Sequence, residues 1–193
     1  MIRFAEEADI PQILDIYGPY ILNTTASFEY TVPTVEEFTA RFRGITDRFP
    51  WLVWEEAGVV LGYAYGSAPF ERAAYQWAAE ASVYLRPRVR GRGIGKTLYR
   101  VLEALLGMQG YTVIYAIITS ENRDSLAFHE ALGYREVAEL PDCGFKFGRV
   151  LGVKWLEKRL ISGDFPSEAP VKWRSIVKND RNFLHNLAKM TLS

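Results

Sequence analysis

The sequence contains few of the residues on which redox and metal chemistry depend. Cys143 is the single cysteine, so a disulfide within the chain and a zinc site built from several cysteines are impossible. The two histidines, His129 and His185, stand far apart, which excludes the paired histidines of an HExxH helix. We therefore expect no metal site, and the cysteine content suits a reducing compartment.

Long apolar segments and an excess charge of either sign are also missing. The chain has no run of about 18 apolar residues, and Met1–Glu7 lacks the apolar core of a secretory signal. Lys and Arg number 23 and Asp and Glu number 23, so the net charge is zero and no overall basic field attracts nucleic acid. We expect a cytoplasmic protein that binds neither nucleic acid nor membranes.

The composition is typical of a globular domain. Hydrophobic residues make up 49% and charged residues 24% of the 193 positions, close to the average for soluble proteins, which excludes disordered and fibrous classes. Aromatic residues make up 14%, which suits a pocket with aromatic walls for a small molecule.

The first half of the chain predicts two helices and an antiparallel group of strands. Asp9 is expected to cap the first helix, with Gln12 in the capping-box position. Thr34 is expected to cap the second helix, with Glu37 in the same position, and Pro50 to end it. The expected strands are Ile2–Ala5, Trp51–Glu55, Val59–Ala68 and Trp77–Leu85. The last three are joined by a turn at Gly58 and the loop Pro69–Tyr75, which is typical of an antiparallel meander.

The second half alternates between strands and helices. Ile94–Gly107 has its apolar residues at helical spacing, and Asn122–Leu132 predicts another helix that ends at Gly133. Tyr111–Ile118 is continuously apolar, as a central strand covered on both faces would be. Further strands are expected at Tyr134–Ala138 and Phe145–Leu156. The pattern predicts an α/β (α+β) domain around a mixed sheet.

The last part of the chain has a different character. Residues 161–193 begin with a stretch rich in Pro, Ser and Gly, which reads as a linker, and continue with apolar residues at helical spacing. We therefore expect a domain over residues 1–160 and a C-terminal extension over residues 161–193 with one or two short amphipathic helices. The extension is expected to pack on the domain or on a dimer mate; a helix dedicated to binding a partner is the alternative.

The segment that indicates chemistry joins the strand that ends at Leu85 to the helix that begins near Ile94. From Ala81 to Leu102 there are six basic residues and no acidic one. Glycines allow the backbone to approach a ligand closely, and the free N–H groups and dipole of a helix N-terminus attract anions. The segment therefore predicts a phosphate-binding loop.

The spacing of the glycines selects among phosphate-binding loops. Gly95-Lys96-Thr97 nearly fits the Walker pattern, but Arg90 stands where that pattern needs its first glycine. The Rossmann pattern also fails, whether it starts at Gly91 or at Gly93. The pattern [RQ]-x-x-G-x-[GA] fits Arg90-Gly91-Arg92-Gly93-Ile94-Gly95, which resembles the pyrophosphate loop of the acetyl-coenzyme A-binding N-acetyltransferases of the GNAT superfamily.

Two neighbouring segments extend this resemblance. Glu80-Ala81-Ser82-Val83-Tyr84-Leu85 resembles the strand of the superfamily that carries the acyl group, and the segment from Asn122 to Tyr134 resembles its N-x-x-[SA]…G-[FY] helix. A closer resemblance, to the phosphinothricin/methionine sulfone N-acetyltransferase family, covers about residues 2 to 158. Its other matching stretches are Arg48-Phe49-Pro50-Trp51-Leu52-Val53, Ala74-Tyr75-Gln76-Trp77 and Gly144-Phe145-Lys146-Phe147-Gly148.

The resemblance implies the GNAT fold, with an antiparallel N-terminal meander and helices on both faces of a mixed sheet. It also implies acetyl-CoA as co-substrate and a homodimer. A bulge at Val83, Tyr84 and Leu85 would splay the strand beside the pantetheine arm and free an N–H for the thioester carbonyl. The residues that would hold the cofactor are Val83, Tyr84, Leu85, Arg90, Gly91, Arg92, Gly93, Ile94, Gly95, Lys96, Asn122 and Ser125.

The same resemblance assigns the catalytic roles. Glu80 would take a proton from the substrate ammonium, since a carboxylate half-buried among aromatic residues has a raised pKa. His129 would either protonate the leaving thiolate or serve as a packed helix histidine. Direct transfer from thioester to amine needs no acyl-enzyme, so Cys143 is not expected to act as a nucleophile.

Aromatic residues are expected to line the amine site. The expected wall consists of Phe28, Tyr30, Ala73, Ala74 and Tyr75, with Phe145, Lys146 and Phe147 opposite. Phosphinothricin-type members often have Asn-Phe-Arg where this chain has Ser27-Phe28-Glu29, and the change from a cation to an anion argues against a doubly anionic phosphinate. We therefore expect N-acetylation of a small amino-acid-like amine, of methionine sulfone/sulfoximine or phosphinothricin type. The alternatives are acetylation of protein N-termini or lysines and a non-catalytic acyl-CoA-binding module.

Overall fold

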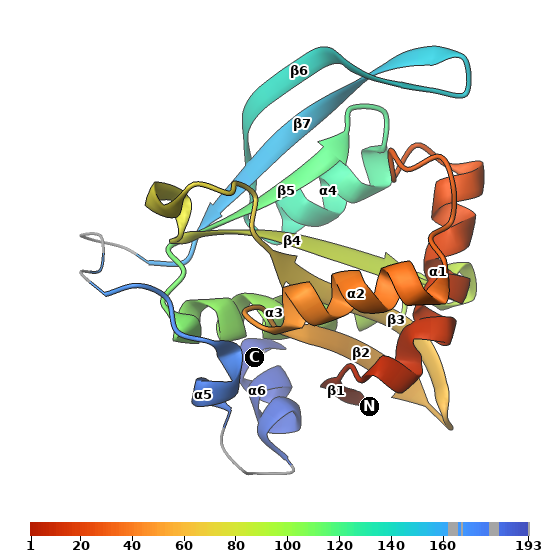
Figure 1. The fold of residues 1–193 in the computed structure, drawn as a ribbon. Coiled ribbons are helices and arrows are strands. Elements are labelled where there is room, and N and C mark those ends of the chain that lie inside the picture. The colour runs from red at the N-terminus through yellow and green to blue at the C-terminus, as the bar shows by residue number, and fades with distance from the viewer. Residues whose placement is uncertain (162–165, 167, 178–181, 193) are drawn as a thin grey trace.

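The computed structural model describes the chain except for residues 162–165, 167, 178–181 and 193. Its framework is a seven-stranded sheet in the order β1-β2-β3-β4-β5-β7-β6 (Figure 1). The antiparallel meander from β2 to β4 is confirmed, and β1 adds antiparallel to β2. β4 pairs parallel to β5, so the predicted mixed sheet is confirmed as well. The strands are β1 (Ile2–Phe4), β2 (Trp51–Glu56), β3 (Val59–Ser67), β4 (Ala78–Leu85), β5 (Val113–Thr119), β6 (Arg135–Lys146) and β7 (Arg149–Arg159).

Helices cover both faces of the sheet, as predicted (Figure 1). Alternate strand residues point to opposite faces, so Ala79 and Ala81 pack toward α3 while Trp51 and Tyr63 pack toward α1 and α2. The long helices are α1 (Ile10–Asn23), α2 (Val35–Thr46), α3 (Ile94–Gln109) and α4 (Arg123–Ala131). Three short 3-10 turns are η1 (Glu7–Asp9), η2 (Ala73–Tyr75) and η3 (Pro87–Val89).

The predicted cap of α2 is confirmed. The Thr34 hydroxyl accepts the backbone N–H of Glu37 at 3.2 Å, and the Glu37 carboxylate accepts the backbone N–H of Thr34 at 2.8 Å. Two donors that the helix leaves unpaired are therefore satisfied within four residues of sequence.

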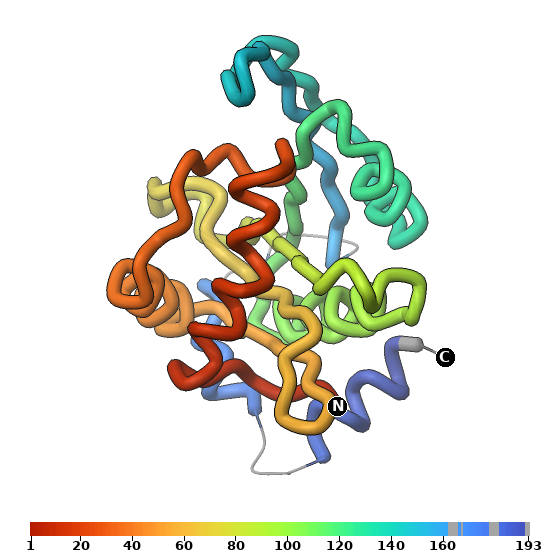
Figure 2. The backbone as a smooth tube through the Cα atoms, turned by 90° about the vertical axis from the view of Figure 1, so that its right-hand side faces the viewer, coloured from red at the N-terminus to blue at the C-terminus, as the bar shows by residue number. Residues whose placement is uncertain are grey.

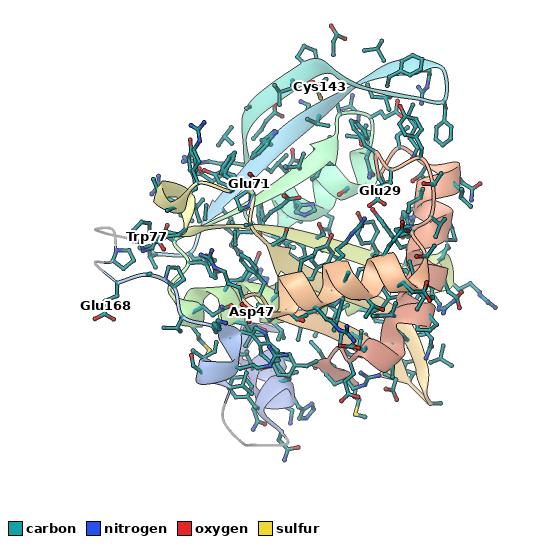
Figure 3. The ribbon with its side chains drawn as sticks, in the orientation of Figure 1. Glu29, Asp47, Glu71, Trp77, Cys143 and Glu168 are labelled. Atoms are coloured by element: carbon teal, nitrogen blue, oxygen red, sulfur yellow. The ribbon has the colours of Figure 1, made fainter. Side chains whose placement is uncertain are left out.

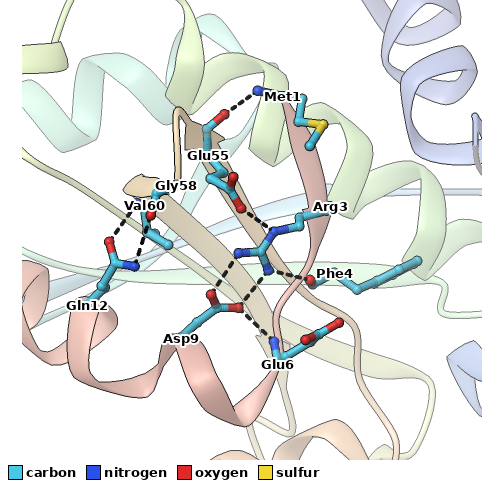
Figure 4. Close-up of polar contacts among 9 residues, drawn as sticks. All are labelled: Met1, Arg3, Phe4, Glu6, Asp9, Gln12, Glu55, Gly58 and Val60. Atoms are coloured by element: carbon cyan, nitrogen blue, oxygen red, sulfur yellow. Dashed lines mark hydrogen bonds and ion pairs between the residues drawn. The ribbon is translucent and has the colours of Figure 1, made fainter.

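The predicted cap of α1 is wrong. The chain enters α1 from η1, so Asp9 is already helical, with φ −81° and ψ −15°, and its side chain makes no capping bond to α1. The Asp9 carboxylate instead accepts the Glu6 N–H at 2.8 Å and pairs with Arg3 at 2.7 Å (Figure 4). Gln12 accepts the backbone N–H of Val60 at 2.9 Å, so both residues tie the start of α1 to the sheet edge.

The predicted strand bounds in the last hairpin are also wrong. β6 runs without interruption to Lys146, so Phe145 and Lys146 belong to β6 and not to the strand that follows. Phe147 and Gly148 form the turn, with φ 51° and 73°, the left-handed pair that a tight two-residue hairpin requires. Two register shifts along β6 obscure the alternation of apolar residues in the sequence. The hairpin of β6 and β7 projects beyond the rest of the sheet (Figure 1).

The C-terminal extension packs on the domain. It contains α5 (Trp173–Ile176) and α6 (Phe183–Leu192), and α6 lies beside α3 and β1 (Figure 2). Leu184 and Ala188 of α6 are buried in the core on the α3 face. The indole N–H of Trp173 donates to Thr46 O at 2.9 Å, and its ring lies 4.4 Å from that of Phe4. The expected linker falls partly on residues 162–165 and 167, outside the described residues, and the boundary at residue 160 stays a prediction.

Candidate active site

A cleft opens where β4 and β5 separate. The two strands pair only from Ala78–Glu80 to Val113–Tyr115, and beyond Glu80 they diverge around a cavity of about 570 Å³. The predicted bulge is wrong, because β4 stays in unbroken register with β3 through Leu85. The gap results from the end of the β4–β5 ladder and not from an extra residue in β4.

The free edge of β4 faces this cleft. The Arg86 N–H donates to Leu61 O at 2.9 Å, and residues in an antiparallel pair alternate between those that bond across the ladder and those that do not. The N–H and C=O groups of Ala81, Val83 and Leu85 therefore point away from β3, toward the side that β5 has left.

Two tyrosine hydroxyls donate hydrogen bonds to backbone carbonyls on this edge of β4. The hydroxyl of Tyr99 on α3 donates to Ala81 O at 3.0 Å, and that of Tyr20 on α1 donates to Leu85 O at 2.7 Å. Val83 lies between these two capped carbonyls and presents its N–H and C=O to the cleft. A ligand with an amide or carbonyl group can therefore bond to Val83 much as a neighbouring strand would.

The glycine-rich loop forms the other end of the cavity. Gly91 and Gly93 have φ values of 79° and 77°, and a Cβ on either would meet no atom within 4 Å, so the space beside them is open. The first helical bond of α3 runs from Thr97 N–H to Gly93 O at 3.0 Å, so the N–H groups of the preceding residues have no partner within the helix. The loop thus joins free donors, a helix dipole and basic side chains at one end of the cleft.

The two arginines of the loop have different surroundings. Arg90 lines the cavity, and its ion pair with Asp124 is long, at 3.9 Å. Arg92 pairs with Glu56 on β2 at 2.8 Å and does not line the cavity. The structure brings the other residues expected to hold the cofactor to this one cavity: Val83, Tyr84, Leu85, Arg90, Gly91, Gly93, Ile94, Gly95, Lys96, Asn122 and Ser125.

Glu80 lies where the β4–β5 ladder ends. Its position on β4 alternates with Ala79 and Ala81, so its side chain lies on the face that carries α1 and α2, opposite α3. The side chain is half-buried, and burial raises the pKa of Glu80 to about 7. Near neutral pH such a carboxylate can both accept a proton and release it.

His129 borders the same cavity from α4. Its Nδ1 lies 2.7 Å from Ser125 O and its Nε2 lies 2.8 Å from the Tyr99 hydroxyl, so both ring nitrogens have partners. Burial lowers the pKa of His129. The geometry is compatible with both roles that the sequence left open for this residue, a proton donor at the cleft and a packed helix histidine.

The residues expected to line the amine site fall into two groups. None of them lines the cavity between β4 and β5. In the first, the loop between α1 and α2 contacts the β6–β7 hairpin: the Phe28 ring packs against the backbone of Gly144, and the Tyr30 hydroxyl donates to Phe145 O. Phe147 follows at the exposed turn of this hairpin.

The second group surrounds η2, which contains Ala73, Ala74 and Tyr75. Tyr75 contacts Phe70 with a centroid distance of 4.5 Å, and Phe70 stacks on Trp155 of β7 at 5.6 Å. Phe70 and Trp155 were not predicted from the sequence, because their pairing depends on how the η2 segment folds over the sheet. The nearby indole of Trp77 donates to the carbonyl of Glu168 at 3.0 Å, and Figure 3 shows these two residues side by side.

The placement of Lys146 disagrees with its expected role in the amine site. The residue is 2% exposed, and its ammonium donates to the backbone carbonyls of Ile21 at 2.7 Å, Thr24 at 2.9 Å and also Ser27. These carbonyls belong to the end of α1 and the loop that follows it. The charge of Lys146 therefore fastens the hairpin to that loop and is not available to a substrate.

The charge of Glu29 is also used within the protein. Its carboxylate accepts from the Tyr17 hydroxyl at 2.9 Å and pairs with Arg41 of α2 at 2.7 Å (Figure 3). The loop thus presents an ion pair with no net charge, where the sequence alone suggested a bare anion. An anionic substrate would therefore not meet an unpaired anion at this loop.

Within the described residues, no three His, Cys, Asp or Glu side chains gather in a way that could hold a metal ion. In the same part of the chain, no helix is both long enough and apolar enough to cross a membrane.

Comparison with known proteins completes the description of the site. Residues 2–155 match the acetyltransferase (GNAT) domain family. The chain is 36% identical to phosphinothricin N-acetyltransferase of Streptomyces viridochromogenes, covering 88% of this chain and 90% of that protein. It is 39% identical to L-methionine sulfoximine/L-methionine sulfone acetyltransferase of Pseudomonas paraeruginosa, covering 82% and 94%.

A solved structure shows the same agreement in three dimensions. The phosphinothricin acetyltransferase of Sinorhizobium meliloti, in complex with acetyl-CoA, aligns with a TM-score of 0.81 and 36% identity, covering 89% of this chain and 92% of that one. The chain belongs to the acetyltransferase (GNAT) domain family.

Proposed function

We propose that this protein transfers the acetyl group of acetyl-CoA directly to the amine of a small amino-acid-like substrate. The observation that carries the proposal is the free edge at Val83, which opens into the same cavity as the glycine-rich loop and ends beside Glu80. The names of the relatives support it, since they are phosphinothricin and methionine sulfoximine/sulfone acetyltransferases.

The cavity suits acetyl-CoA along its whole length. The diphosphate would accept from the free N–H groups at the start of α3, with Arg90 and Lys96 adding charge. The pantetheine amides would bond to Val83 and to the side chain of Asn122, and Ser125 would line the same channel. The thioester would then lie beside β4, close to Glu80.

The reaction needs a base, a carbonyl activated by hydrogen bonds and a proton donor. Glu80 takes a proton from the substrate ammonium, and the freed amine attacks the thioester carbonyl. The N–H groups on the outer edge of β4 stabilise the negative charge on the carbonyl oxygen. The C–N bond forms and the C–S bond breaks. The nitrogen gives up its second proton to become the amide, and the sulfur takes a proton, for which His129 is the candidate donor.

The aromatic groups around Phe28 and Tyr75 suit an acceptor of methionine sulfone or sulfoximine type. The ion pair of Glu29 with Arg41 leaves this wall without net charge, so a phosphinothricin-like acceptor is compatible with it as well. An assay of thiol release, with acetyl-CoA and a panel of amino acids, amino-acid analogues, amines and peptides, tests the proposal. Acetyl-CoA binding without turnover of any acceptor would contradict it and favour a non-catalytic acyl-CoA-binding module, and turnover of peptides alone would favour a protein N-terminal or lysine acetyltransferase.

The two loop arginines provide a matched pair for the cofactor site. Arg90→Ala should raise the Kd for acetyl-CoA about tenfold, because it removes one charge-assisted contact that is partly screened by solvent. Arg92→Ala should change this Kd less than about threefold, because the Arg92 side chain is paired with Glu56 outside the cavity. Calorimetric titration with acetyl-CoA measures both values. Equal effects of the two changes would show that the phosphates do not bind beside Arg90.

We also propose that the protein works in the cytoplasm as a homodimer. The projecting β6–β7 hairpin supports the dimer, since it exposes several apolar side chains: Val137, Leu140, Phe145, Phe147 and Val150. Light scattering on the purified chain should give the mass of a dimer, and Val150→Glu should shift it toward the monomer. Val59→Glu, at an exposed apolar site outside the hairpin, should leave the mass unchanged. A wild-type mass of 22.0 kDa at all concentrations would contradict the dimer.

A further inference from the structure

A buried chain of polar contacts runs behind the cleft. The Tyr99 hydroxyl lies 3.0 Å from Ala81 O and 2.8 Å from Nε2 of His129, and Nδ1 of His129 lies 2.7 Å from Ser125 O. Ala81, Ser125 and His129 all line the cavity, whereas Tyr99 is 0% exposed. From its position in the core, Tyr99 therefore contacts two walls of the cleft, one formed by β4 and the other by α4.

These three contacts need more hydrogens than the neutral side chains have. A carbonyl oxygen only accepts, so Nδ1 of His129 must carry the hydrogen that points to Ser125. Nε2 of a neutral imidazole then has no hydrogen, and the single hydroxyl hydrogen of Tyr99 can serve either Nε2 or Ala81. In the imidazolium, Nε2 donates to the Tyr99 oxygen while Tyr99 donates to Ala81, so every contact is made.

The other titratable groups near the His129 ring do not compete with Tyr99 for a hydrogen bond to Nε2. The Tyr134 ring meets the imidazole edge-on at 5.3 Å, and its buried hydroxyl interacts with Tyr99 and Glu103 and not with the ring nitrogens. Glu103 of α3 pairs with Lys158 of β7 at 2.7 Å, so these two charges largely offset each other. Burial lowers the pKa of His129, and the bond to Ser125 opposes that effect.

We propose that Tyr99 is a positioning residue for the acetyl transfer, which fixes Ala81 and the imidazole of His129 relative to each other through one hydroxyl group. The inference rests on the proposed function and extends it to a residue that does not itself reach the substrates. Because the hydroxyl accepts the Nε2 hydrogen of the imidazolium, it also stabilises the charged form of His129 against the effect of burial.

The kinetic test uses Tyr99→Phe in the full chain, which keeps the ring that packs against Phe128 at 5.5 Å. The kcat should fall about tenfold, while the KM values for acetyl-CoA and the acceptor stay within about threefold. In a His129→Ala background the same change should reduce kcat less than about twofold, because the group through which Tyr99 acts is already gone. Tyr111→Phe, at a buried tyrosine whose hydroxyl binds Arg48 at 2.7 Å away from the cavity, is the matched control, and its kcat should stay within about twofold of wild type.

A second readout needs no turnover. The chain has two histidines, so proton NMR of the ring signals can follow His129, with His185 on the exposed face of α6 as the reference. In Tyr99→Phe the titration midpoint of His129 should move to lower pH by about half a pH unit or more, because the charged ring loses the acceptor for its Nε2 hydrogen.

The outcomes separate this inference from the proposed function. A wild-type protein without turnover would overturn the proposed function, and the NMR titration would still decide whether Tyr99 governs the imidazole. An unmoved His129 signal in Tyr99→Phe would overturn the inference even if kcat falls, because the loss would then be structural. A loss of kcat of the same size in the His129→Ala background would overturn it as well.

Discussion

Replacing Glu80 with Gln should reduce kcat by about 100- to 10,000-fold while the Kd for acetyl-CoA stays within about threefold. The amide keeps the size and polarity of the side chain but cannot take the proton from the substrate ammonium. Steady-state kinetics and calorimetric titration of acetyl-CoA check the two parts. Glu130→Gln, at an exposed position on α4, is the matched control and should retain the wild-type rate. Glu80→Gln with near wild-type kcat would show that another group is the base.

The pH dependence of the wild-type enzyme follows from the same residue. Since burial raises the pKa of Glu80 to about 7, raising the pH from 6 to 8 converts the acid to the carboxylate that acts as base. The kcat/KM for the acceptor should therefore rise with a midpoint near pH 7. The deficit of Glu80→Gln should shrink as the pH approaches the pKa of the acceptor amine, because the free amine then needs no base. A flat profile between pH 6 and 8 would contradict this assignment.

As the pH rises, the free energy of unfolding should change in the opposite direction to kcat/KM. The folded state holds its proton on Glu80 up to about pH 7, whereas the unfolded state loses it near 4.5, so the folded state binds more protons in between. The contribution of Glu80 to the free energy of unfolding therefore decreases as the pH rises through this range. Glu80→Gln should be more stable than wild type at pH 8, and the difference should vanish below pH 4.5. Urea unfolding at the two pH values measures this difference.

Replacing Lys146 with Met should lower the free energy of unfolding by about 3 kcal/mol. The methionine fills a similar volume but leaves the carbonyls of Ile21, Thr24 and Ser27 buried without their donor. For a chain of this size, the melting temperature should fall by roughly 6–12 °C. Calorimetry and urea unfolding measure the two quantities.

Lys154→Met serves as the comparison for this prediction. Lys154 stands on β7 of the same hairpin, but its ammonium pairs with the exposed side chain of Glu136 at 2.8 Å. Such a pair is worth about 0–1 kcal/mol, so this variant should unfold close to wild type. A loss below about 1 kcal/mol in Lys146→Met would mean that the ammonium does not hold the loop.

The parts of the site that could be predicted from the sequence are local. The free donors at Gly93 and the residues after it arise from a glycine next to a helix start, and Thr34 with Glu37 forms a cap within one turn. Glu80 is placed on one face of β4 by simple alternation of side chains. Each of these features depends on neighbours in the sequence, and the structure places all of them where the pattern indicates.

The predictions that were wrong or incomplete concern contacts between distant segments. The ammonium of Lys146 binds a carbonyl 125 positions away in the sequence, and Arg92 pairs with a carboxylate 36 positions away. Asp9 turned toward Arg3 because η1 had already made it helical. Side-chain types and spacing contain no information about which of several possible partners the folded chain brings within reach.

The sequence by itself determined the alternation of strands and helices and the position of the glycine-rich loop at a helix start, because these depend on local backbone geometry. The choice of Glu80 as the base rests on the family resemblance and stays a prediction. The tertiary structure decided that β4 and β5 separate beyond Glu80 and that Tyr99 and Tyr20 cap the carbonyls on either side of Val83. It also decided that the ammonium of Lys146 binds a backbone carbonyl at the end of α1 and so holds the loop that follows. Those features arise only when α1, α3 and the β6–β7 hairpin pack around the sheet, since each needs a donor and an acceptor that the chain keeps far apart.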